Sequence, residues 1–221
     1  MKELKILESK WFVVGELVLL YSIPFLPLFE TTAFYLRPLV IFLLCFFLLR
    51  MRGKGLASLG LSWSNLTGKA ILIGSVLGIT FAFTQNWGIE PLVRELVGER
   101  IDLSIFEFIK GNTPAYFELL AIGLLVGGFF EEFYYRGYLI TRFGDMINHR
   151  VVALIIAVLI GSTLFAFGHS YQGTLGIVIN FYFAILNAVV FIAFKRNLWY
   201  AVFFHGMYDA VGITALYLGT Y

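Results

Sequence analysis

Long apolar stretches dominate the chain, and most of them are long enough to cross a membrane as a helix. The hydrocarbon core of a bilayer is about 30 Å thick, so a spanning helix needs roughly 20 apolar residues. Seven stretches meet or approach this length: 11–29, 35–50, 70–87, 114–136, 151–169, 173–194 and 198–218. The pattern predicts an all-α fold, a polytopic transmembrane helical bundle of about seven spans.

The first stretch, residues 11–29, is expected to remain as a helix. It lacks the short apolar region and the small-residue cleavage site of a removable signal peptide. Proline removes a backbone donor and clashes with the preceding helical turn. We therefore expect Pro24 and Pro27 to kink or end this helix.

Positive charge is distributed unevenly between the two sides of the predicted bundle. With the N-terminus inside, the inner flanks hold Lys2, Lys5, Lys10, Arg50, Arg52, Lys54, Lys69, Arg136, Arg142, Arg150, Lys195 and Arg196. The outer side then holds only Arg37, Arg94, Arg100 and Lys110. Because cytoplasmic flanks collect Lys and Arg, this bias predicts an N-inside orientation with the C-terminus outside.

Two long connections organise the chain. Residues 51–69 are rich in Gly and Ser and are expected to form a loop or a surface-lying segment. Residues 88–113 intersperse acids with apolar residues, which predicts an amphipathic segment on the outer face. Residues 1–113 would then form an N-terminal group of transmembrane helices, and residues 114–221 a core of four helices.

Composition narrows the class of protein further. The chain is 60% hydrophobic and 14% charged, against about 45–50% and about 25% in soluble domains. The net charge of +2 provides no basic field for a nucleic acid. The single cysteine, Cys45, excludes a disulfide framework and a cysteine-based zinc site. The expected partners are the lipid bilayer and a membrane protein or peptide.

Ionisable residues inside membrane spans are costly and indicate function. In this chain they gather in the last four spans: Glu131, Glu132, Arg136, His169, His205 and Asp209. Two other carboxylates, Glu16 and Glu118, lie near span ends and are expected to reach water. The candidate site is therefore expected in the C-terminal half.

Helical spacing divides these residues by role. Glu132 and Arg136 are four residues apart and can form an ion pair along one helix. Glu131 lies about 100° around the helix axis from Glu132, so it need not serve the same purpose. We expect a structural Glu132–Arg136 pair and a Glu131 side chain that faces a cavity. Residues from neighbouring spans would meet it there: His169, His205 and Asp209.

Such a cluster suits hydrolysis. A carboxylate beside an imidazole can act as a general base on water, and a second imidazole with a carboxyl can stabilise an oxyanion. The same four groups (Glu131, His169, His205 and Asp209) are also potential ligands of a divalent metal such as zinc. The sequence does not separate these two chemistries, and no cofactor is favoured.

The motifs resemble those of a known family. Glu131, Glu132 and Arg136 form an E-E-x-x-x-R motif, Phe165 and His169 form F-x-x-x-H, and His205 and Asp209 form H-x-x-x-N/D. In this order on successive spans they resemble the CAAX protease and bacteriocin-processing (Abi) family of intramembrane endopeptidases. The type II CAAX prenyl endopeptidase is a branch of that family.

The resemblance implies a membrane endopeptidase that cleaves a membrane-associated or prenylated protein or peptide. It implies that Glu131 and His169 activate water and that His205 and Asp209 form the oxyanion site, with Glu132 and Arg136 in support. Family members have been described as metal-dependent, and a metal-free glutamate mechanism is favoured here. Asp209 is similar to the prokaryotic Abi-type members, which implies a multi-pass protein of a prokaryotic cell membrane.

Two other functions are compatible with the same residues. Some Abi-type proteins are tied to bacteriocin immunity, so the chain could be a non-catalytic immunity or scaffold protein. A small proton-coupled carrier could use a Glu, His and Asp relay, although no internal repeat typical of many transporters is present.

Overall fold

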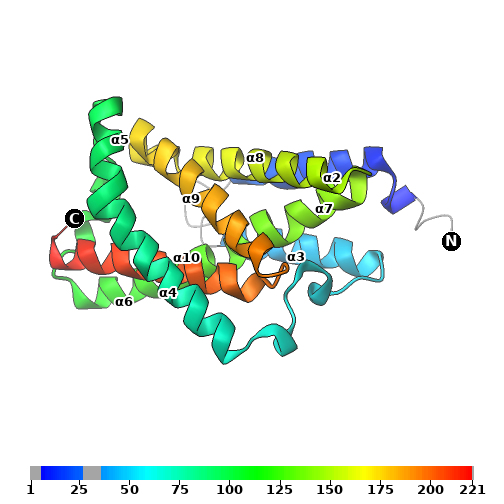
Figure 1. The fold of residues 1–221 in the computed structure, drawn as a ribbon, viewed down its shortest axis with the longest axis horizontal. Helices are drawn as coiled ribbons and strands as arrows, with labels where there is room; N and C mark the ends of the chain where they lie inside the picture. The colour runs from blue at the N-terminus through cyan, green and yellow to red at the C-terminus, as the bar shows by residue number, and fades with distance from the viewer. Residues whose placement is uncertain (1–5, 27–35, 221) are drawn as a thin grey trace.

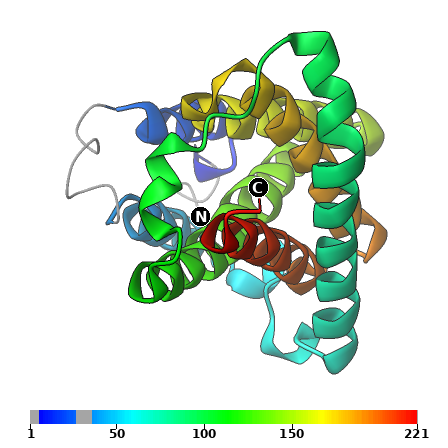
Figure 2. The ribbon, with the colours of Figure 1, turned by 90° about the vertical axis from the view of Figure 1, so that its left-hand side faces the viewer.

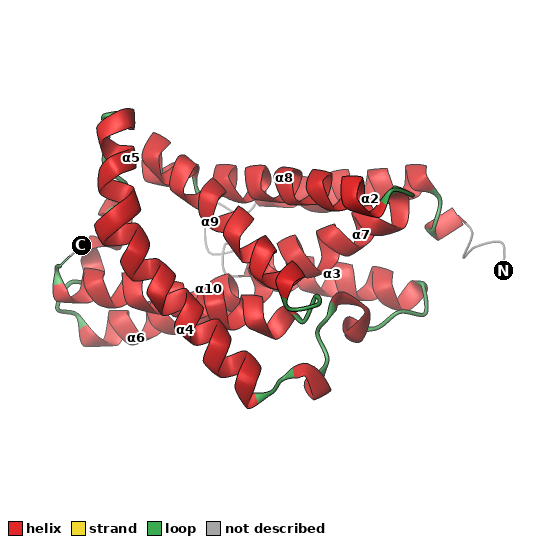
Figure 3. Ribbon diagram, viewed as in Figure 1, coloured by secondary structure: helices red, strands yellow, loops and turns green. Residues whose placement is uncertain are grey.

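Helices account for nearly all of the computed structural model, which describes residues 6–26 and 36–220 (Figure 1). These described residues contain no strand (Figure 3). The helical elements are α2 (Lys10–Ser22), η1 (Ile23–Phe25), α3 (Arg37–Met51), η4 (Leu56–Leu59), η5 (Trp63–Asn65), α4 (Gly68–Thr84), η6 (Gln85–Ile89), α5 (Glu90–Val97), η7 (Ser104–Ile109), α6 (Thr113–Ile122), η8 (Gly123–Glu131), η9 (Phe133–Tyr138), α7 (Leu139–Met146), α8 (Arg150–Gly168), η10 (Ser170–Gln172), α9 (Gly173–Ala193) and α10 (Leu198–Leu218). The predicted all-helical class is confirmed for this part of the chain.

Five helical runs are long and apolar enough to cross a membrane. Within the described ranges these are Gly68–Val97, Thr113–Met146, Arg150–Gly168, Ser170–Ala193 and Leu198–Leu218. They correspond to the last five of the seven predicted spans. The chain is therefore a multi-pass membrane protein, whereas the count of seven and the N-inside orientation remain predictions.

The first two predicted spans are shorter helices. α2 has 13 residues and α3 has 15, fewer than the roughly 20 that a perpendicular span needs. The α-helix ends at Ser22, and Pro24 lies in the 3-10 turn η1 that follows. Pro24 thus ends the helix as expected, while Pro27 lies outside the described residues.

The helix that carries the first motif is longer than predicted. It was expected to end at residue 136, but it continues through α7 to Met146. The expectation failed because Arg136 and Arg142 are both buried and paired inside the protein, so neither marks the membrane surface. Much of this helix, η8 and η9, is π-helical, a form that occurs frequently at functional sites.

α10 lies at the centre of the bundle when the molecule is seen end-on (Figure 2). It packs against α4, α6, η8 and α9. Gly78 on α4 permits a close crossing, because a Cβ there would lie 2.1 Å from the carbonyl oxygen of Phe204. The crossing of η8 is also close, since a Cβ on Gly128 would lie 3.1 Å from the Cα of Gly206. Small residues at such crossings are typical of membrane helix packing.

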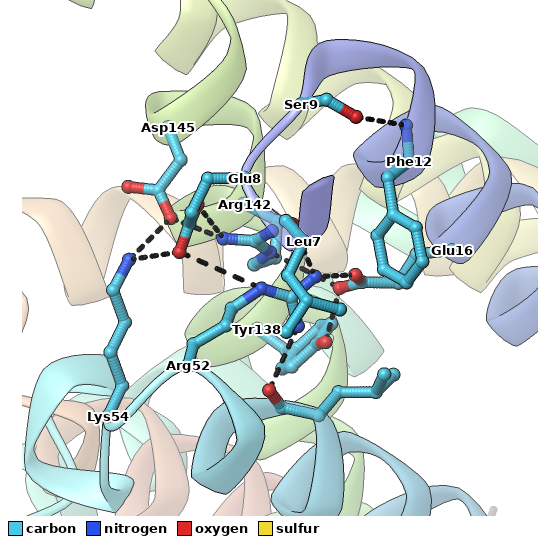
Figure 4. Close-up of polar contacts among 11 residues, drawn as sticks. Leu7, Glu8, Ser9, Phe12, Glu16, Arg52, Lys54, Tyr138, Arg142 and Asp145 are labelled. Atoms are coloured by element: carbon cyan, nitrogen blue, oxygen red, sulfur yellow. Dashed lines mark hydrogen bonds and ion pairs between the residues drawn. The ribbon is translucent and has the colours of Figure 1, made fainter. Parts of the chain in front are cut away.

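A buried charge cluster joins the N-terminal helices to α7 (Figure 4). Arg52, Tyr138 and Arg142 all donate hydrogen bonds to the carboxylate of Glu16, the last from Nε at 3.2 Å. The Glu16 side chain is 1% exposed. The expectation that Glu16 reaches water is therefore wrong, because three donors from distant parts of the chain enclose it.

Two of the Arg residues assigned to the inner flank belong to this cluster. Arg52 and Arg142 are buried, and their charges are compensated by Glu16 together with Glu8 and Asp145 rather than by solvent. At the edge of the cluster Arg142 Nη1 lies 2.5 Å from Asp145 Oδ2, and Lys54 Nζ lies 3.1 Å from the same atom. The cluster holds α2, the end of α3 and α7 together.

The two long connections contain short helical pieces. Residues 51–69 hold the 3-10 turns η4 and η5. In residues 88–113, α5 continues the α4 helix, and η7 follows after an irregular stretch. The backbone amide of Asp102 bonds to the carbonyl of Gln172 at 3.0 Å, which ties this segment to the turn between α8 and α9.

Candidate active site

Glu132 connects two of the predicted motifs. Its Oε1 accepts a hydrogen bond from Arg136 Nη1 at 2.9 Å and lies 2.7 Å from His205 Nδ1. Arg136 Nη2 also donates to the carbonyl of Ala184 on α9 at 3.1 Å. Glu132, Arg136 and His205 are all buried. The predicted Glu132–Arg136 pair is therefore present, and it also anchors the imidazole of α10.

The hydrogen bond to Glu132 determines how His205 can act. A carboxylate paired with a guanidinium is an acceptor, so His205 Nδ1 carries the proton that bonds to Glu132. Nε2 faces the two remaining carboxyl groups, 3.5 Å from Asp209 Oδ2 and 3.9 Å from Glu131 Oε2. His205 can donate from Nε2 only as the imidazolium.

Glu131 and Asp209 are more accessible than the groups behind them. Their side chains are 26% and 23% exposed, against 4% for His205 and 0% for Glu132. These two carboxyl groups come from η8 and α10 and approach the same imidazole nitrogen. Glu131 thus faces a cavity, as its position on the helix predicted.

His169 follows the end of α8, where its ring is oriented by its own helix. Nδ1 lies 2.9 Å from the carbonyl oxygen of Phe165. Because a carbonyl only accepts, Nδ1 donates this hydrogen bond, and the neutral ring keeps a lone pair on Nε2. That nitrogen is available to accept a proton or a hydrogen bond from water.

Aromatic rings fix the positions of both imidazoles. The Phe165 ring lies 4.5 Å from the His169 ring and 5.9 Å from the His205 ring. Phe183 on α9 contacts His205 edge-on, with 4.7 Å between the ring centroids. The Arg136 guanidinium lies over Phe165 at 4.9 Å. The two imidazoles therefore lie in a largely apolar frame.

Gly127 allows Asp209 and His205 to reach this position. A Cβ at Gly127 would lie 2.3 Å from Asp209 Oδ2 and 3.2 Å from His205 Nε2. The missing side chain leaves space for both polar groups against η8. No larger residue fits without displacing them.

One cavity of about 420 Å³ brings the four predicted catalytic residues together, with Glu131, His169, His205 and Asp209 all in its lining. We call it the core cavity. Residues of the outer segment, among them Ile101, Phe106 and Phe108, line it too. Its mixture of apolar walls and a few convergent polar groups is typical of a substrate site.

A second cavity of about 460 Å³ adjoins the first. Its lining includes Arg37, and we call it the Arg37 cavity. The two cavities share four lining residues: Val126, Glu131, His169 and Tyr171. Glu131 and His169 therefore lie where the two spaces meet.

Comparison with known families agrees with this arrangement. Residues 113–211 match the family described as type II CAAX prenyl endopeptidase Rce1-like, and this region contains every site residue named above except Arg37 and the lining residues of the outer segment. This match supports the assignment of residues 113–211 to the CAAX protease family. No curated protein and no solved structure gives a significant match.

The match to this family indicates a protease, and several apolar helices indicate a protein embedded in a membrane. The match covers the four helical runs from α6 to most of α10. The specific roles of the site residues do not follow from the family match alone. They depend on the geometry described above.

The site does not have the geometry of a metal centre. In residues 6–26 and 36–220, no three His, Cys, Asp or Glu side chains are arranged to hold a metal ion. The residues as placed do not fit a divalent metal, and we derive no step through one.

Several contributors to the site were not identified from the sequence. Gly127, Tyr171 and Phe183 belong to it because of helix crossings that a single sequence does not reveal. Gly123 and Gly127 are spaced as G-x-x-x-G, a spacing typical of close helix packing. This spacing was the available signal for Gly127, whereas the two aromatic residues had none.

Proposed function

We propose that the protein is an intramembrane endopeptidase that cleaves a membrane-associated or prenylated protein or peptide with water activated by Glu131 and His169. The observation that carries this proposal is the shared lining of one cavity by Glu131, His169, His205 and Asp209. The family match over residues 113–211 supports the reaction class. We place the protein in a prokaryotic cell membrane, with seven spans and the N-terminus inside.

In the proposed reaction, water lies between the Glu131 carboxylate and His169 Nε2. Glu131 takes one proton as the water oxygen attacks the carbonyl carbon of the scissile peptide bond. The carbonyl oxygen becomes an oxyanion, and the C–N bond then breaks as Glu131 returns the proton to the leaving nitrogen. The second proton of the water passes from the new carboxylic acid to the amine, so the products are a carboxylate and an ammonium group, and atoms and protons balance.

The oxyanion would be stabilised by His205 and Asp209, and this role requires a donated proton. Nδ1 of His205 already bonds to Glu132. His205 and Asp209 can therefore donate a hydrogen bond to the oxyanion only from protonated Nε2 or from the carboxylic acid form of Asp209. The separation of 3.5 Å between Nε2 and Oδ2 lets the two groups share such a proton. Preorganised donors of this kind act strongly in a low-dielectric site.

The direct test compares the termini of membrane proteins, by mass spectrometry, in cells with the wild-type protein and cells with Glu131→Gln. Glu118→Gln is a matched control, because Glu118 lies on α6 of the same helical run, is exposed, and lines neither cavity. We expect new termini with the wild type and with Glu118→Gln that are absent with Glu131→Gln.

The alternative functions predict a different result. A non-catalytic immunity or scaffold protein would produce the same termini in all three strains, provided that the three proteins are equally abundant and folded. That result would overturn the proposed reaction. The cleavage sites found in a positive result would also identify the substrate.

A further inference from the structure

Asn180 is a polar side chain on an otherwise apolar wall of the core cavity. The residues of α9 that line this cavity are Ile179, Asn180 and Phe183. Asn180 also lies within one of the helical runs that can cross a membrane, where a polar side chain is costly and indicates function. The proposed reaction uses the ionisable groups of the cavity, and Asn180 has no part in it.

The hydrogen bonds of Asn180 determine the orientation of its amide. Nδ2 donates to the carbonyl of Gly176 and to Oε1 of Gln172, each at 2.8 Å. Because a main-chain carbonyl only accepts, the atom beside the carbonyl of Gly176 must be the amide nitrogen. Both N–H groups of Asn180 are therefore used within the protein, and Oδ1 is the atom left to bond elsewhere.

The residues around Asn180 maintain this orientation. A Cβ at Gly176 would lie 2.3 Å from Cβ of Gln172 and 3.3 Å from its Oε1, so a larger residue there would displace Gln172. Gln172 Nε2 in turn donates to the Tyr171 hydroxyl at 3.3 Å. Tyr171, Gln172 and Asn180 thus form a chain of polar side chains, and all three line the core cavity.

Oδ1 of Asn180 offers an acceptor to a molecule in the cavity. Within the described ranges it receives no hydrogen bond from the protein. The carboxylates of the same cavity, Glu131 and Asp209, take part in the proposed reaction. A peptide that enters this site leaves water, and a main-chain N–H that stays unbonded in a low-dielectric environment is costly. Oδ1 can satisfy one such group.

Phe183 places Asn180 near the reacting groups. Phe183 packs edge-on against His205, with 4.7 Å between the ring centroids. Asn180 lies three residues before Phe183 on the same helix, which is about 4.5 Å along the helix axis. An extended peptide advances about 3.3 Å per residue. The N–H that reaches Oδ1 should therefore belong to a residue within about three positions of the cleaved bond.

Resting on the proposed function, we propose that Asn180 is a substrate-binding residue that accepts a main-chain N–H of the peptide in the core cavity. This hydrogen bond would fix the register of the peptide, so that the scissile carbonyl lies beside the water held by Glu131 and His169. Because the bond is made to the main chain, it does not depend on the side chains of the substrate.

The test uses peptides synthesised around a cleavage site identified in cells. In each peptide one amide near the cleaved bond, other than the scissile amide, is replaced by an ester, which removes a single N–H donor. Asn180→Leu removes the acceptor, whereas Asn180→Asp keeps an acceptor oxygen and loses the bonds donated to Gly176 and Gln172. Asn187→Leu is the matched control, because Asn187 lies about two turns further along α9 and lines neither cavity.

We expect one ester to lower kcat/KM of the wild type about tenfold or more. The same ester should lower kcat/KM of Asn180→Leu by less than about twofold, because the two changes remove the same hydrogen bond. Asn180→Asp and Asn187→Leu should keep the wild-type penalty. A residue that only stabilised α9 would not change the response to a single substrate atom. If Asn180→Leu does not fold, Asn180→Ala removes the same acceptor and replaces it in the comparison.

An ester penalty of the same size in the wild type and Asn180→Leu at every position would overturn the inference while leaving the proposed function intact. Loss of the penalty in Asn180→Asp or Asn187→Leu would also overturn it, because the effect would then not depend on the acceptor oxygen of Asn180. If the wild type cleaves nothing in cells or in vitro, the proposed function fails, and the inference fails with it.

Discussion

Two buried clusters of charged residues, one around Glu16 and one around His205, contain the same kinds of side chain but differ in role. Both oxygens of Glu16 accept hydrogen bonds from buried partners, and its side chain is 1% exposed. Glu131 is 26% exposed and lines two cavities. A carboxylate whose oxygens are bonded within the protein stabilises the fold, whereas one that faces a cavity is available for chemistry.

The second cluster contains both kinds of carboxylate, and Glu132 is the one that is bonded within the protein. It neighbours Glu131 in sequence, yet it is fully buried and bonds to Arg136 and His205. Its contacts resemble those of Glu16 more than those of Glu131. The E-E pair thus combines a structural acid that orients an imidazole with an accessible acid.

The largest effect on stability is expected from Glu16→Gln. This change removes the buried carboxylate that Arg52 and Arg142 share and leaves them only the more exposed Glu8 and Asp145 as counter-charges. Breaking a buried ion pair costs about 3–5 kcal/mol. We expect a lower free energy of unfolding in detergent and an unchanged activity per folded molecule. Glu118→Gln is the control. An equal free energy of unfolding for Glu16→Gln and Glu118→Gln would contradict the claim that the cluster around Glu16 stabilises the fold.

A smaller effect, confined to the site, is expected from Gly127→Ala. The added Cβ would collide with Asp209 Oδ2, and overpacking of this kind costs about 1–3 kcal/mol. We expect a loss of activity of about tenfold or more, while the helical content measured by circular dichroism stays the same. Gly88→Ala is the control because a Cβ there meets nothing within 4 Å. Full activity of Gly127→Ala would show that Asp209 need not occupy its present position.

The smallest effect is expected from Asp209→Asn. An amide donates a hydrogen bond from the same place as a carboxylic acid, so the rate should fall by no more than about fivefold, or roughly 1 kcal/mol. Asp209→Ala removes the donor and should lower kcat by about 100-fold or more. Equal loss in the two variants, measured with the same peptide, would show that the charge of Asp209 or its exchange of a proton is essential.

Much of the site could be predicted because its residues follow a motif with helical spacing. Glu131, Glu132 and Arg136 lie within two turns of one helix, and their relative directions follow from its geometry. The structure brings His169, His205 and Asp209 to the same cavity as Glu131. The spacing did not reveal which nitrogen of each imidazole faces the cavity, because that depends on partners from other elements.

The Glu16 cluster could not be predicted for the same reason. Glu16 and Arg142 are separated by 126 positions, and their pairing depends on how α2 packs against α7. Counting charges therefore placed Arg52 and Arg142 at the membrane surface. Buried arginines distort such counts, because their charge is neutralised inside the protein.

The measurement that tests the central claim most directly is peptide hydrolysis by purified Glu131→Gln, with its thermal unfolding recorded in the same detergent and compared with Glu16→Gln. The account predicts that Glu131→Gln unfolds like the wild type and loses about 100-fold or more of its activity. It predicts the reverse for Glu16→Gln, which should unfold at a lower temperature and retain activity per folded molecule. A stable Glu131→Gln protein that still cleaves the peptide at the wild-type rate would contradict the claim.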